Sequence, residues 1–169
     1  MYTIIGLGNP GNEYIETRHN TGRIIAEGLG YKILDEFMNN SGRAVVKLVK
    51  SKKAAQKLII IHDDLDLALG KFKISYNKSA GGHRGVASIV RALKTQEFIR
   101  IRVGISPTTP AGKLRKPKGE DAVLKFILGK FKPNEMLILK KMTKKISEAI
   151  SLIIAGDIGI AQNKFNTDV

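Results

Sequence analysis

The 169-residue sequence contains no cysteine, which excludes thiol nucleophiles, disulfides and cysteine-ligated zinc and fits a reducing compartment. It also has no apolar run close to the roughly 18 residues that a membrane-spanning helix needs. A positively charged and then apolar leader with a small-residue cleavage site is missing as well. We therefore expect a cytosolic protein that does not contact a membrane.

Aromatic residues are scarce, at 6% of the chain, which argues against the base-stacking platforms of single-strand binders. Lysine and arginine number 29 against 15 aspartates and glutamates, so the net charge is +14. Such a charge favours a polyanionic partner, and nucleic acid bound mainly through its phosphates is the natural candidate. A lysine-rich proteome, in which soluble surfaces are simply basic, is the alternative explanation of this charge.

The apolar segments predict one α/β domain over residues 1–169. Apolar residues make up 43% of the chain, enough for a sizeable core. Strands alternate with helices, which predicts a three-layer sandwich with a mostly parallel, twisted sheet flanked by helices. The expected strands are Tyr2–Ile5, Tyr31–Leu34, Leu58–Ile61, Gly70–Tyr76 and Phe98–Ile105. The expected helices are Thr21–Leu29, one that Ser41 caps and the basic run Lys50–Lys53 ends, Val86–Leu93, Asp121–Leu128 and Pro133–Ala155.

The segment Gly6–Asn20 reads GLGNPGNEYIETRHN and follows the first expected strand. Pro10 pushes Asn9 towards extended geometry, which holds the Asn9 amide at the carboxyl end of that strand. His19 lies near the same edge, where ligands bind in open α/β sheets. The glycines also match the G-x-G-x-x-G spacing of dinucleotide-binding turns, with Asp35 as the acidic partner. Against that alternative, Pro10 removes an N–H donor and no helix is expected to open there; a further alternative is that His19 only begins the next helix.

A second polar cluster, His62–Asp66, directly follows the expected buried strand, where polar groups are costly without a role or partner. The chain offers no cysteine and no G-x-S-x-G serine, so water is the expected nucleophile. Neutral His19 can accept a proton from water, and Asp63 can fix its tautomer and stabilise the imidazolium. The amides of Asn9 and Asn39 can bind the developing oxyanion or the acyl chain. An ester is activated enough to be the substrate of such a site.

A metal site is the competing chemistry. The candidate nitrogen and oxygen ligands are His19, His62, His83, Asp63, Asp64 and Asp66. No H-E-x-x-H or similar pair places two of them on one helix face, so the spacing does not favour metal-assisted hydrolysis. His62 and Asp64 are more often packing and surface residues.

Two later segments indicate anion binding. Ser79–Gly85 is a glycine-rich turn before a helix, which can hold a phosphate or bring the backbone close to a substrate. Phe98–Ile105 alternates basic and apolar residues, so we expect one core face and one basic face with Arg100 and Arg102. Ser106–Gly119 carries three of the five prolines and several basic residues, which predicts a mobile surface loop.

The motifs, taken together, resemble bacterial-type peptidyl-tRNA hydrolase along almost the whole chain. In order they are GLGNPGNEYIETRHNTG, FMNNSG, IHDDLDLALGKFKI, GGHRG and FIRIRVGI. The resemblance implies a monomeric, cytosolic enzyme that needs no metal or cofactor. It implies hydrolysis of the ester that joins a peptide to the 3′ ribose of tRNA, with peptidyl-tRNA as the partner.

The resemblance also assigns roles by motif. It makes His19 of RHN the base that activates water, Asp63 its partner, and Asn9 of GNPG the residue that senses the peptide next to the ester. The positions that match the binding site of the acyl and 3′-terminal part are Tyr14, Phe37 and Asn39. Those that match the family's phosphate-binding basic pair are Lys73 and Arg102, and the loop Ser106–Gly119 corresponds to part of its lid.

Three departures from the family pattern stand out. Arg84 replaces the asparagine common in the GGHNG turn; it offers donors but no acceptor, so it can hold a phosphate or an acyl carbonyl. The chain is shorter between His19 and Phe37, which predicts a reduced sheet and a more exposed cleft. It is slightly longer between Lys73 and His83. A catalytically silent RNA-binding protein on the same scaffold is the rival interpretation, which the intact motif residues argue against.

Overall fold

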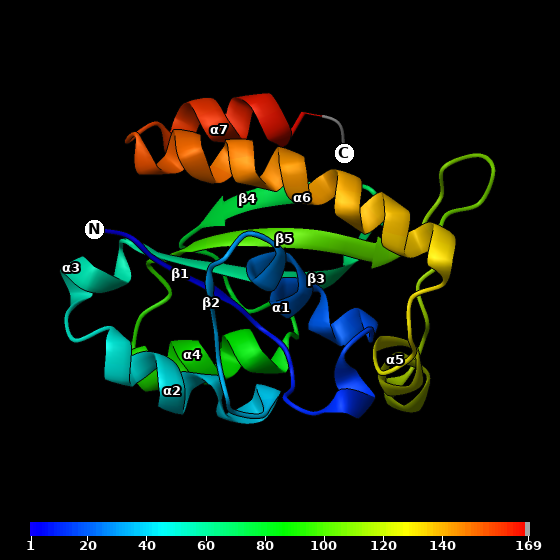
Figure 1. The fold of residues 1–169 in the computed structure, drawn as a ribbon, viewed down its shortest axis with the longest axis horizontal. Coiled ribbons are helices and arrows are strands. Elements are labelled where there is room, and N and C mark those ends of the chain that lie inside the picture. Colours follow the sequence, from blue (N-terminus) through cyan, green and yellow to red (C-terminus); the bar gives the residue numbers. More distant parts are fainter. Residues whose placement is uncertain (168–169) are drawn as a thin grey trace.

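A five-stranded sheet lies between two layers of helices in the computed structural model, which describes residues 1–167 (Figure 1). This arrangement confirms the predicted α/β sandwich. The strands are β1 (Thr3–Gly6), β2 (Lys32–Ile33), β3 (Leu58–Ala68), β4 (Phe72–Tyr76) and β5 (Ile99–Ser106). The α-helices are α1 (Thr21–Gly28), α2 (Ser41–Leu48), α3 (Lys52–Ala55), α4 (Arg84–Leu93), α5 (Glu120–Ile127), α6 (Pro133–Ile154) and α7 (Ile158–Phe165). Three short 3-10 helices are η1 (Asn12–Tyr14), η2 (Arg18–Asn20) and η3 (Met38–Asn40).

The strand order is β2-β1-β3-β5-β4, and every neighbouring pair is parallel except β4 with β5. The sheet is therefore mostly parallel, as predicted, with one antiparallel edge strand. At the other edge β2 has only two residues, which matches the shortened region predicted between His19 and Phe37.

The central strand β3 supplies both halves of the core because its side chains alternate between the two faces. Ile59 and Ile61 pack on the side of α1, α6 and α7, whereas Leu58 and Ile60 pack on the side of α2 and α4. All four side chains are fully buried. Helix α5 lies apart from both layers, at the end of the sheet towards which β5 points (Figure 1).

Several predicted boundaries were wrong. β3 does not end at Ile61 but continues through Ala68, because β5 pairs with it beyond that point, for example Asp63 with Val103. The polar cluster His62–Asp66 therefore lies within the strand rather than after it.

The helix expected from Ser41 to Lys53 is two helices. Ser41 is the first residue of α2 and its hydroxyl donates to the Met38 carbonyl, so it does not cap the helix. α2 ends at Leu48, and the Ser51 hydroxyl accepts from the Ala54 N–H to begin α3.

Helix α7 was not predicted, and it covers the edge strand β4. The Asn166 side chain accepts a hydrogen bond from the Ile74 N–H at 2.8 Å and donates one to the Ile74 carbonyl at 2.9 Å. These contacts satisfy backbone groups that an edge strand would otherwise present to another chain. None of the helices among residues 1–167 has both the length and the apolar character needed to span a bilayer.

Glycines let α1 approach the sheet closely enough to bring His19 to β3. A Cβ on Gly22 would lie 2.0 Å from the Ile61 carbonyl oxygen, and a Cβ on Gly6 would lie 2.1 Å from the Gly22 carbonyl oxygen. Both contacts are with backbone carbonyl oxygens, which cannot move away by a change of side-chain rotamer. Because η2 leads directly into α1, this approach sets the position of His19 against the strand.

We expect Gly22→Ala to lower the free energy of unfolding by about 1–3 kcal/mol, because the added methyl group must push α1 off β3. Gly28→Ala in the same helix is the matched control, since its nearest contact would be the Thr143 Cγ2 at 3.9 Å. Alanine there should be neutral or stabilising by up to about 1 kcal/mol. Urea unfolding of both variants checks this; equal destabilisation would contradict the packing argument.

Candidate active site

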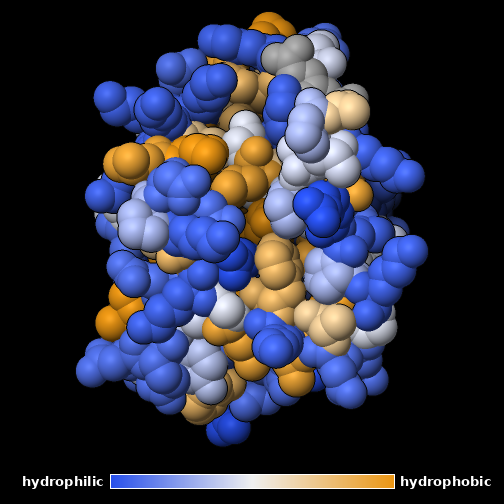
Figure 2. All heavy atoms as spheres, turned by 90° about the vertical axis from the view of Figure 1, so that its right-hand side faces the viewer, coloured by the Kyte–Doolittle hydropathy of each residue, from blue (hydrophilic) through white to orange (hydrophobic). Residues whose placement is uncertain are grey.

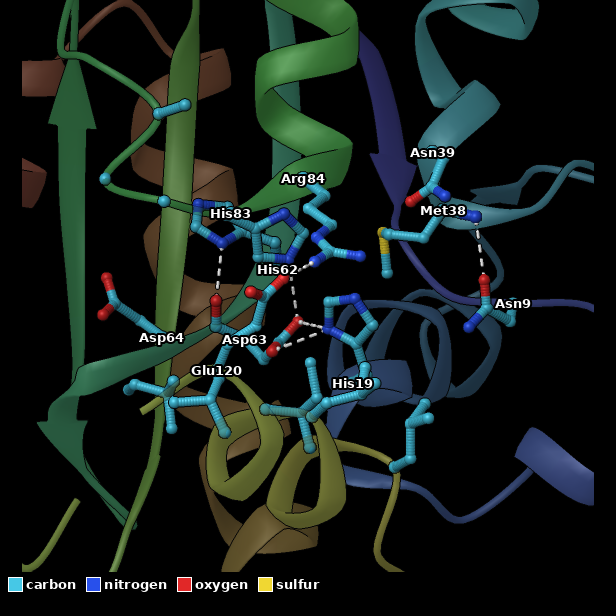
Figure 3. A pocket seen from close by; sticks show the side chains of 18 of the residues that line it. Asn9, His19, Met38, Asn39, His62, Asp63, Asp64, His83, Arg84 and Glu120 are labelled. Atoms are coloured by element: carbon cyan, nitrogen blue, oxygen red, sulfur yellow. Dashed lines mark hydrogen bonds and ion pairs between the residues drawn. The ribbon is translucent and has the colours of Figure 1, made fainter. Parts of the chain in front are cut away.

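A cavity of about 500 Å³ opens beyond the carboxyl end of β1 and beside residues His62–Asp66 within β3. Its volume lies within the size range of small-molecule sites. Seven of the nine residues predicted for the site line it: Asn9, Tyr14, His19, Phe37, Asn39, Asp63 and Arg84. Figure 2 shows this side of the molecule, with a strip of apolar side chains running down its middle between hydrophilic ones. Figure 3 shows the polar residues gathered inside the cavity.

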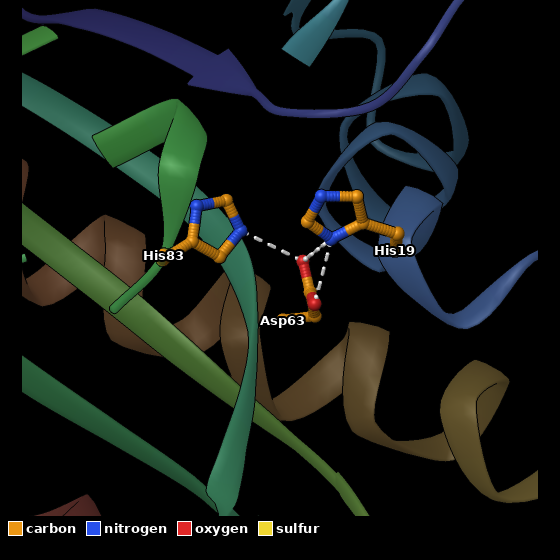
Figure 4. Close-up of side chains that lie close together, drawn as sticks. All are labelled: His19, Asp63 and His83. Carbon is orange, nitrogen blue, oxygen red and sulfur yellow. Dashed lines mark hydrogen bonds and ion pairs between the residues drawn. The ribbon is translucent and has the colours of Figure 1, made fainter. Parts of the chain in front are cut away.

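Asp63 is bonded to two imidazoles at once (Figure 4). The His19 Nδ1 lies 2.9 Å and 3.1 Å from the two carboxylate oxygens of Asp63, and the His83 Nε2 lies 2.9 Å from Oδ1. The Asp63 side chain is only 4% exposed. Three segments far apart in the sequence, η2, β3 and the start of α4, therefore meet at one carboxylate.

The hydrogen bonds fix the tautomer of His19. A carboxylate only accepts, so the proton of neutral His19 lies on Nδ1 and Nε2 keeps its lone pair. Figure 3 shows that nitrogen turned away from Asp63 towards the open cavity. His19 is thus arranged as a base whose free nitrogen faces the space where a substrate would lie.

His83 is held in the opposite tautomer. Its Nδ1 accepts the Val86 N–H at 3.2 Å and so caps the first turn of α4. The proton of neutral His83 must then lie on Nε2, from which it is donated to Asp63. His83 was considered in the sequence only as a metal ligand; its place before the first residue of a helix was the signal for this capping role.

The charges of the site are strongly coupled. Burial alone raises the pKa of Asp63, but His19 and His83 outweigh burial and hold that pKa well below its usual range. Burial lowers the pKa of His19, Asp63 raises it by charge and by hydrogen bonding, and Arg84 lowers it; the balance lies above the ordinary value of 6.5. Asp63 is therefore ionised at neutral pH, and His19 is a stronger base than a free imidazole.

His62 is a packing residue rather than part of the bonded cluster. Its Nδ1 donates to the Asp63 carbonyl at 2.7 Å. Burial, followed by the charges of His83 and Arg100, lowers its pKa well below 6.5, so it is neutral. Its Nε2 has no hydrogen-bond partner among the described residues. Asp64 was considered a surface residue rather than a site residue. It lines the cavity and forms an ion pair with Arg102.

The cluster is compact enough to be considered as a metal site. One ligand atom each from His19, Asp63 and His83 lie within 4.8 Å of one another. A metal on the His83 Nε2 would move that proton to Nδ1, where it would face the Val86 N–H and break the cap of α4. The donor set therefore fits two imidazole N–H groups that donate to one carboxylate better than it fits a cation.

Asn9 presents one end of its amide to the cavity. Its Oδ1 accepts the Met38 N–H at 2.8 Å, which identifies that atom as oxygen and leaves the Nδ2 donor for a ligand. The Asn20 side chain holds the Asn9 backbone by accepting from its N–H at 2.8 Å and donating to its carbonyl at 2.9 Å. Asn20 was not predicted as a site residue, although it directly follows His19.

The rim of the cavity is apolar and aromatic. Tyr14 and Phe37 stand edge to face with ring centroids 6.2 Å apart, and Phe37 is 53% exposed. Asn39 follows on η3 and is exposed beside them. The opposite wall consists of apolar side chains from α5 and the residue after it: Val123, Leu124, Ile127 and Leu128.

Arg18, directly before His19, ties η2 to the far end of α5. Its guanidinium carbon lies 4.5 Å from the ring centroid of Phe126, and it pairs with Glu135 at 3.0 Å. The Arg18 N–H also donates to the Gly129 carbonyl at 3.0 Å. The carboxyl-terminal end of α5 is therefore fixed close to the segment that carries His19.

The predicted basic pair lies beside the cavity rather than in it. Lys73 and Arg102 are opposite each other on β4 and β5, and they are not among the described residues that line the cavity. Arg102 Nε donates to Asp64 at 2.7 Å, and Asp64 does line it. The predicted basic face of β5 is partly wrong, because Arg100 is buried and donates to the Ser79 carbonyl.

The loop predicted from Ser106 to Gly119 is more ordered than a bare connection. Ser106 ends β5, and Thr108 pairs with Leu114 in an isolated antiparallel bridge. Lys116 forms an ion pair with Asp66 of β3. The loop thus folds back on itself and contacts the strand that carries Asp63.

Comparisons with known proteins agree with the motifs. The sequence model described as peptidyl-tRNA hydrolase matches residues 33–169. A peptidyl-tRNA hydrolase of Chloroflexus aurantiacus is 35% identical over 195 aligned positions, covering 98% of this chain and 99% of the relative, so this match includes the segment with Asn9 and His19. One from Aquifex aeolicus is 34% identical over 170 positions, covering 84% of each.

A solved structure also matches. The crystal structure of peptidyl-tRNA hydrolase from Acinetobacter baumannii superposes with a TM-score of 0.85 at 28% identity, covering 99% of this chain and 95% of that chain. The family match spans most of the sequence and the structural match spans nearly all of it. The chain therefore belongs to the peptidyl-tRNA hydrolase family.

Proposed function

We propose that this cavity hydrolyses the ester bond between the peptide and the 3′ ribose of peptidyl-tRNA, releasing free tRNA and peptide. The observation that carries the proposal is the buried His19–Asp63 pair, in which the second ring nitrogen of His19, Nε2, faces the cavity. Family membership supplies the substrate class. The net charge of +14 fits a polyanionic substrate.

The reaction begins when the His19 Nε2 takes a proton from water as the oxygen attacks the ester carbonyl carbon. The carbonyl oxygen becomes an oxyanion, and His19 becomes an imidazolium that Asp63 stabilises. When the tetrahedral intermediate collapses, the bond to the ribose 3′ oxygen breaks and His19 returns its proton to that oxygen. General-base help of this kind supplies roughly 10²- to 10⁴-fold in rate. Water is the nucleophile throughout, so no covalent enzyme intermediate forms.

Asn9 gives the site a means of recognising a peptide. Its fixed Nδ2 donor can bond to the carbonyl of the peptide group next to the ester, which an unblocked aminoacyl ester lacks. A buried donor left without a partner disfavours such a substrate. The Asn39 amide binds the oxyanion or the acyl chain. Tyr14 and Phe37 contact the acyl group and the 3′-terminal part of the substrate.

The tRNA backbone is bound by Lys73, Arg84 and Arg102, and the loop over residues 106–119 moves as a lid over the cleft. Arg102 must then exchange or share its bond to Asp64 with a phosphate. The active form is a cytosolic monomer and uses neither a metal nor a cofactor.

The decisive test is release of free tRNA from an N-blocked aminoacyl-tRNA. We expect His19→Ala to lower the rate at least about 10²-fold because it removes the base. The wild type should be insensitive to a chelator and should spare the unblocked substrate. Unchanged release by His19→Ala would refute the assignment of the base, and activity that chelator removes and zinc restores would establish a metal mechanism. No release, with tight tRNA binding retained, would point to the catalytically silent binding module.

The pH dependence of kcat/KM provides a second test. His19 must be neutral to act as a base, so activity should fall on the acidic side with an apparent pKa above 6.5. Asp63→Asn removes the charge that raises the pKa of His19, and it leaves burial and the charge of Arg84, which both lower that pKa. The acid limb of this variant should therefore move below pH 6.5, and its rate should fall. Asp66→Asn, which removes the same charge from the same strand, should leave the limb in place. An acid limb that Asp63→Asn does not move would contradict the coupling.

Salt dependence tests the basic pair. We expect Lys73→Ala to weaken tRNA binding and to lower the slope of log K against log salt by about 1, because one phosphate contact is lost. Lys53→Ala on α3, at the end of the sheet where β3 begins and away from the cavity, is the control. Equal slopes for wild type and Lys73→Ala, measured by titration at several salt concentrations, would remove Lys73 from the interface.

A further inference from the structure

Arg84 and Glu120 join two helices across the cavity. Arg84 is the first residue of α4 and Glu120 is the first residue of α5, and both line the cavity. The Arg84 Nη2 lies 3.0 Å from the Glu120 Oε1. Figure 3 shows the Arg84 guanidinium reaching into the space above His19, towards Glu120. The ion pair therefore crosses the place where the substrate would enter.

The Arg84–Glu120 ion pair is weak enough for another anion to replace Glu120. The two side chains are 59% and 81% exposed, and one nitrogen meets one oxygen. Exposed ion pairs of this kind contribute little stability. A phosphate offers a guanidinium two parallel charge-assisted bonds, so it is the stronger partner. A neutral acyl carbonyl would not displace a carboxylate in this way.

The two ends of α5 are held differently. Its carboxyl-terminal end is fixed by Arg18, which lies over Phe126 and bonds to the backbone of Gly129. None of the residues from Glu120 to Ile127 is buried. Its amino-terminal end follows Gly119, whose φ is 86°, and reaches the wall formed by α4 through the Arg84–Glu120 pair. Loss of that pair frees this end while the other end stays in place.

We propose that Arg84 binds a phosphate of the tRNA 3′ end and that Glu120 occupies this phosphate site in the free protein. Substrate binding then exchanges the carboxylate for the phosphate and releases the amino-terminal end of α5 from α4. Glu120 acts as an internal competitor that lowers affinity for any anion too weak to replace it. The inference rests on the proposed function, since tRNA is taken as the ligand.

The test is a double-mutant cycle on binding of deacylated tRNA, followed by fluorescence anisotropy at fixed salt. Glu120→Gln should tighten binding about two- to fivefold, the range that an exposed ion pair can supply. Asp121→Asn is the matched control, because it removes the same charge from the same first turn and forms no ion pair among residues 1–167. Its effect should be smaller than that of Glu120→Gln.

The second arm of the cycle repeats both substitutions in Arg84→Asn, which carries the residue common in the family turn. In that background, Glu120→Gln should change the affinity for tRNA no more than Asp121→Asn does, because no guanidinium is left for Glu120 to occupy. Equal effects of the two acidic substitutions in the wild-type background, or the same gain from Glu120→Gln with and without Arg84, would overturn the proposal. Because this test measures binding, the exchange between Glu120 and phosphate can be refuted while tRNA release by the wild type still supports the hydrolase. Conversely, a wild type that releases no tRNA would refute the hydrolase while the binding cycle still supports the exchange.

Discussion

A carboxylate buried as deeply as Asp63 is costly unless other groups compensate for its lost water, and two imidazole N–H groups do so here. The two bonds make different demands. His19 gives Asp63 its Nδ1 proton and keeps Nε2 free, whereas His83 gives its Nε2 proton because its Nδ1 caps α4. One charge therefore fixes the tautomer of His19, orients both rings and connects β3 to the start of α4.

The cluster depends in turn on close backbone contacts. Gly6 and Gly22 allow α1 to lie against β1 and β3, which brings the segment before α1 to Asp63. On the other face, a Cβ at Gly42 would lie 2.1 Å from the Ser88 carbonyl oxygen, so α2 and α4 also meet through a glycine. The first contact places His19 and the second places the helix that His83 caps. Small residues thus set the geometry that the polar residues use.

Much of this arrangement was predictable from local sequence. The layers and the parallel sheet follow from apolar periodicity, and the cavity position follows from polar residues near the ends of β1 and β3. The bond between His83 and Asp63 was not predictable, because it depends on how far β3 runs and on where α4 begins. Local patterns put the end of β3 at Ile61, but pairing with β5 extends it through the polar cluster.

Other errors have the same origin in tertiary contacts. Arg100 looked like a surface charge from strand alternation, yet the segment at Ser79 folds over it. The missed helix α7 has weak local signals, and its Asn166 bonds to an edge strand about ninety residues earlier in the chain. Long-range pairing and packing decide such cases, and a single sequence does not display them.

The most direct test of the account is ¹⁵N spectroscopy of the imidazoles, which is simple to assign because the chain has three histidines. At mildly alkaline pH we expect a proton on Nδ1 of His19, on Nδ1 of His62 and on Nε2 of His83. This result would show that Asp63 holds both neighbouring rings and leaves the His19 Nε2 free to accept a proton. A proton on Nε2 of His19, or on Nδ1 of His83, would contradict the central claim.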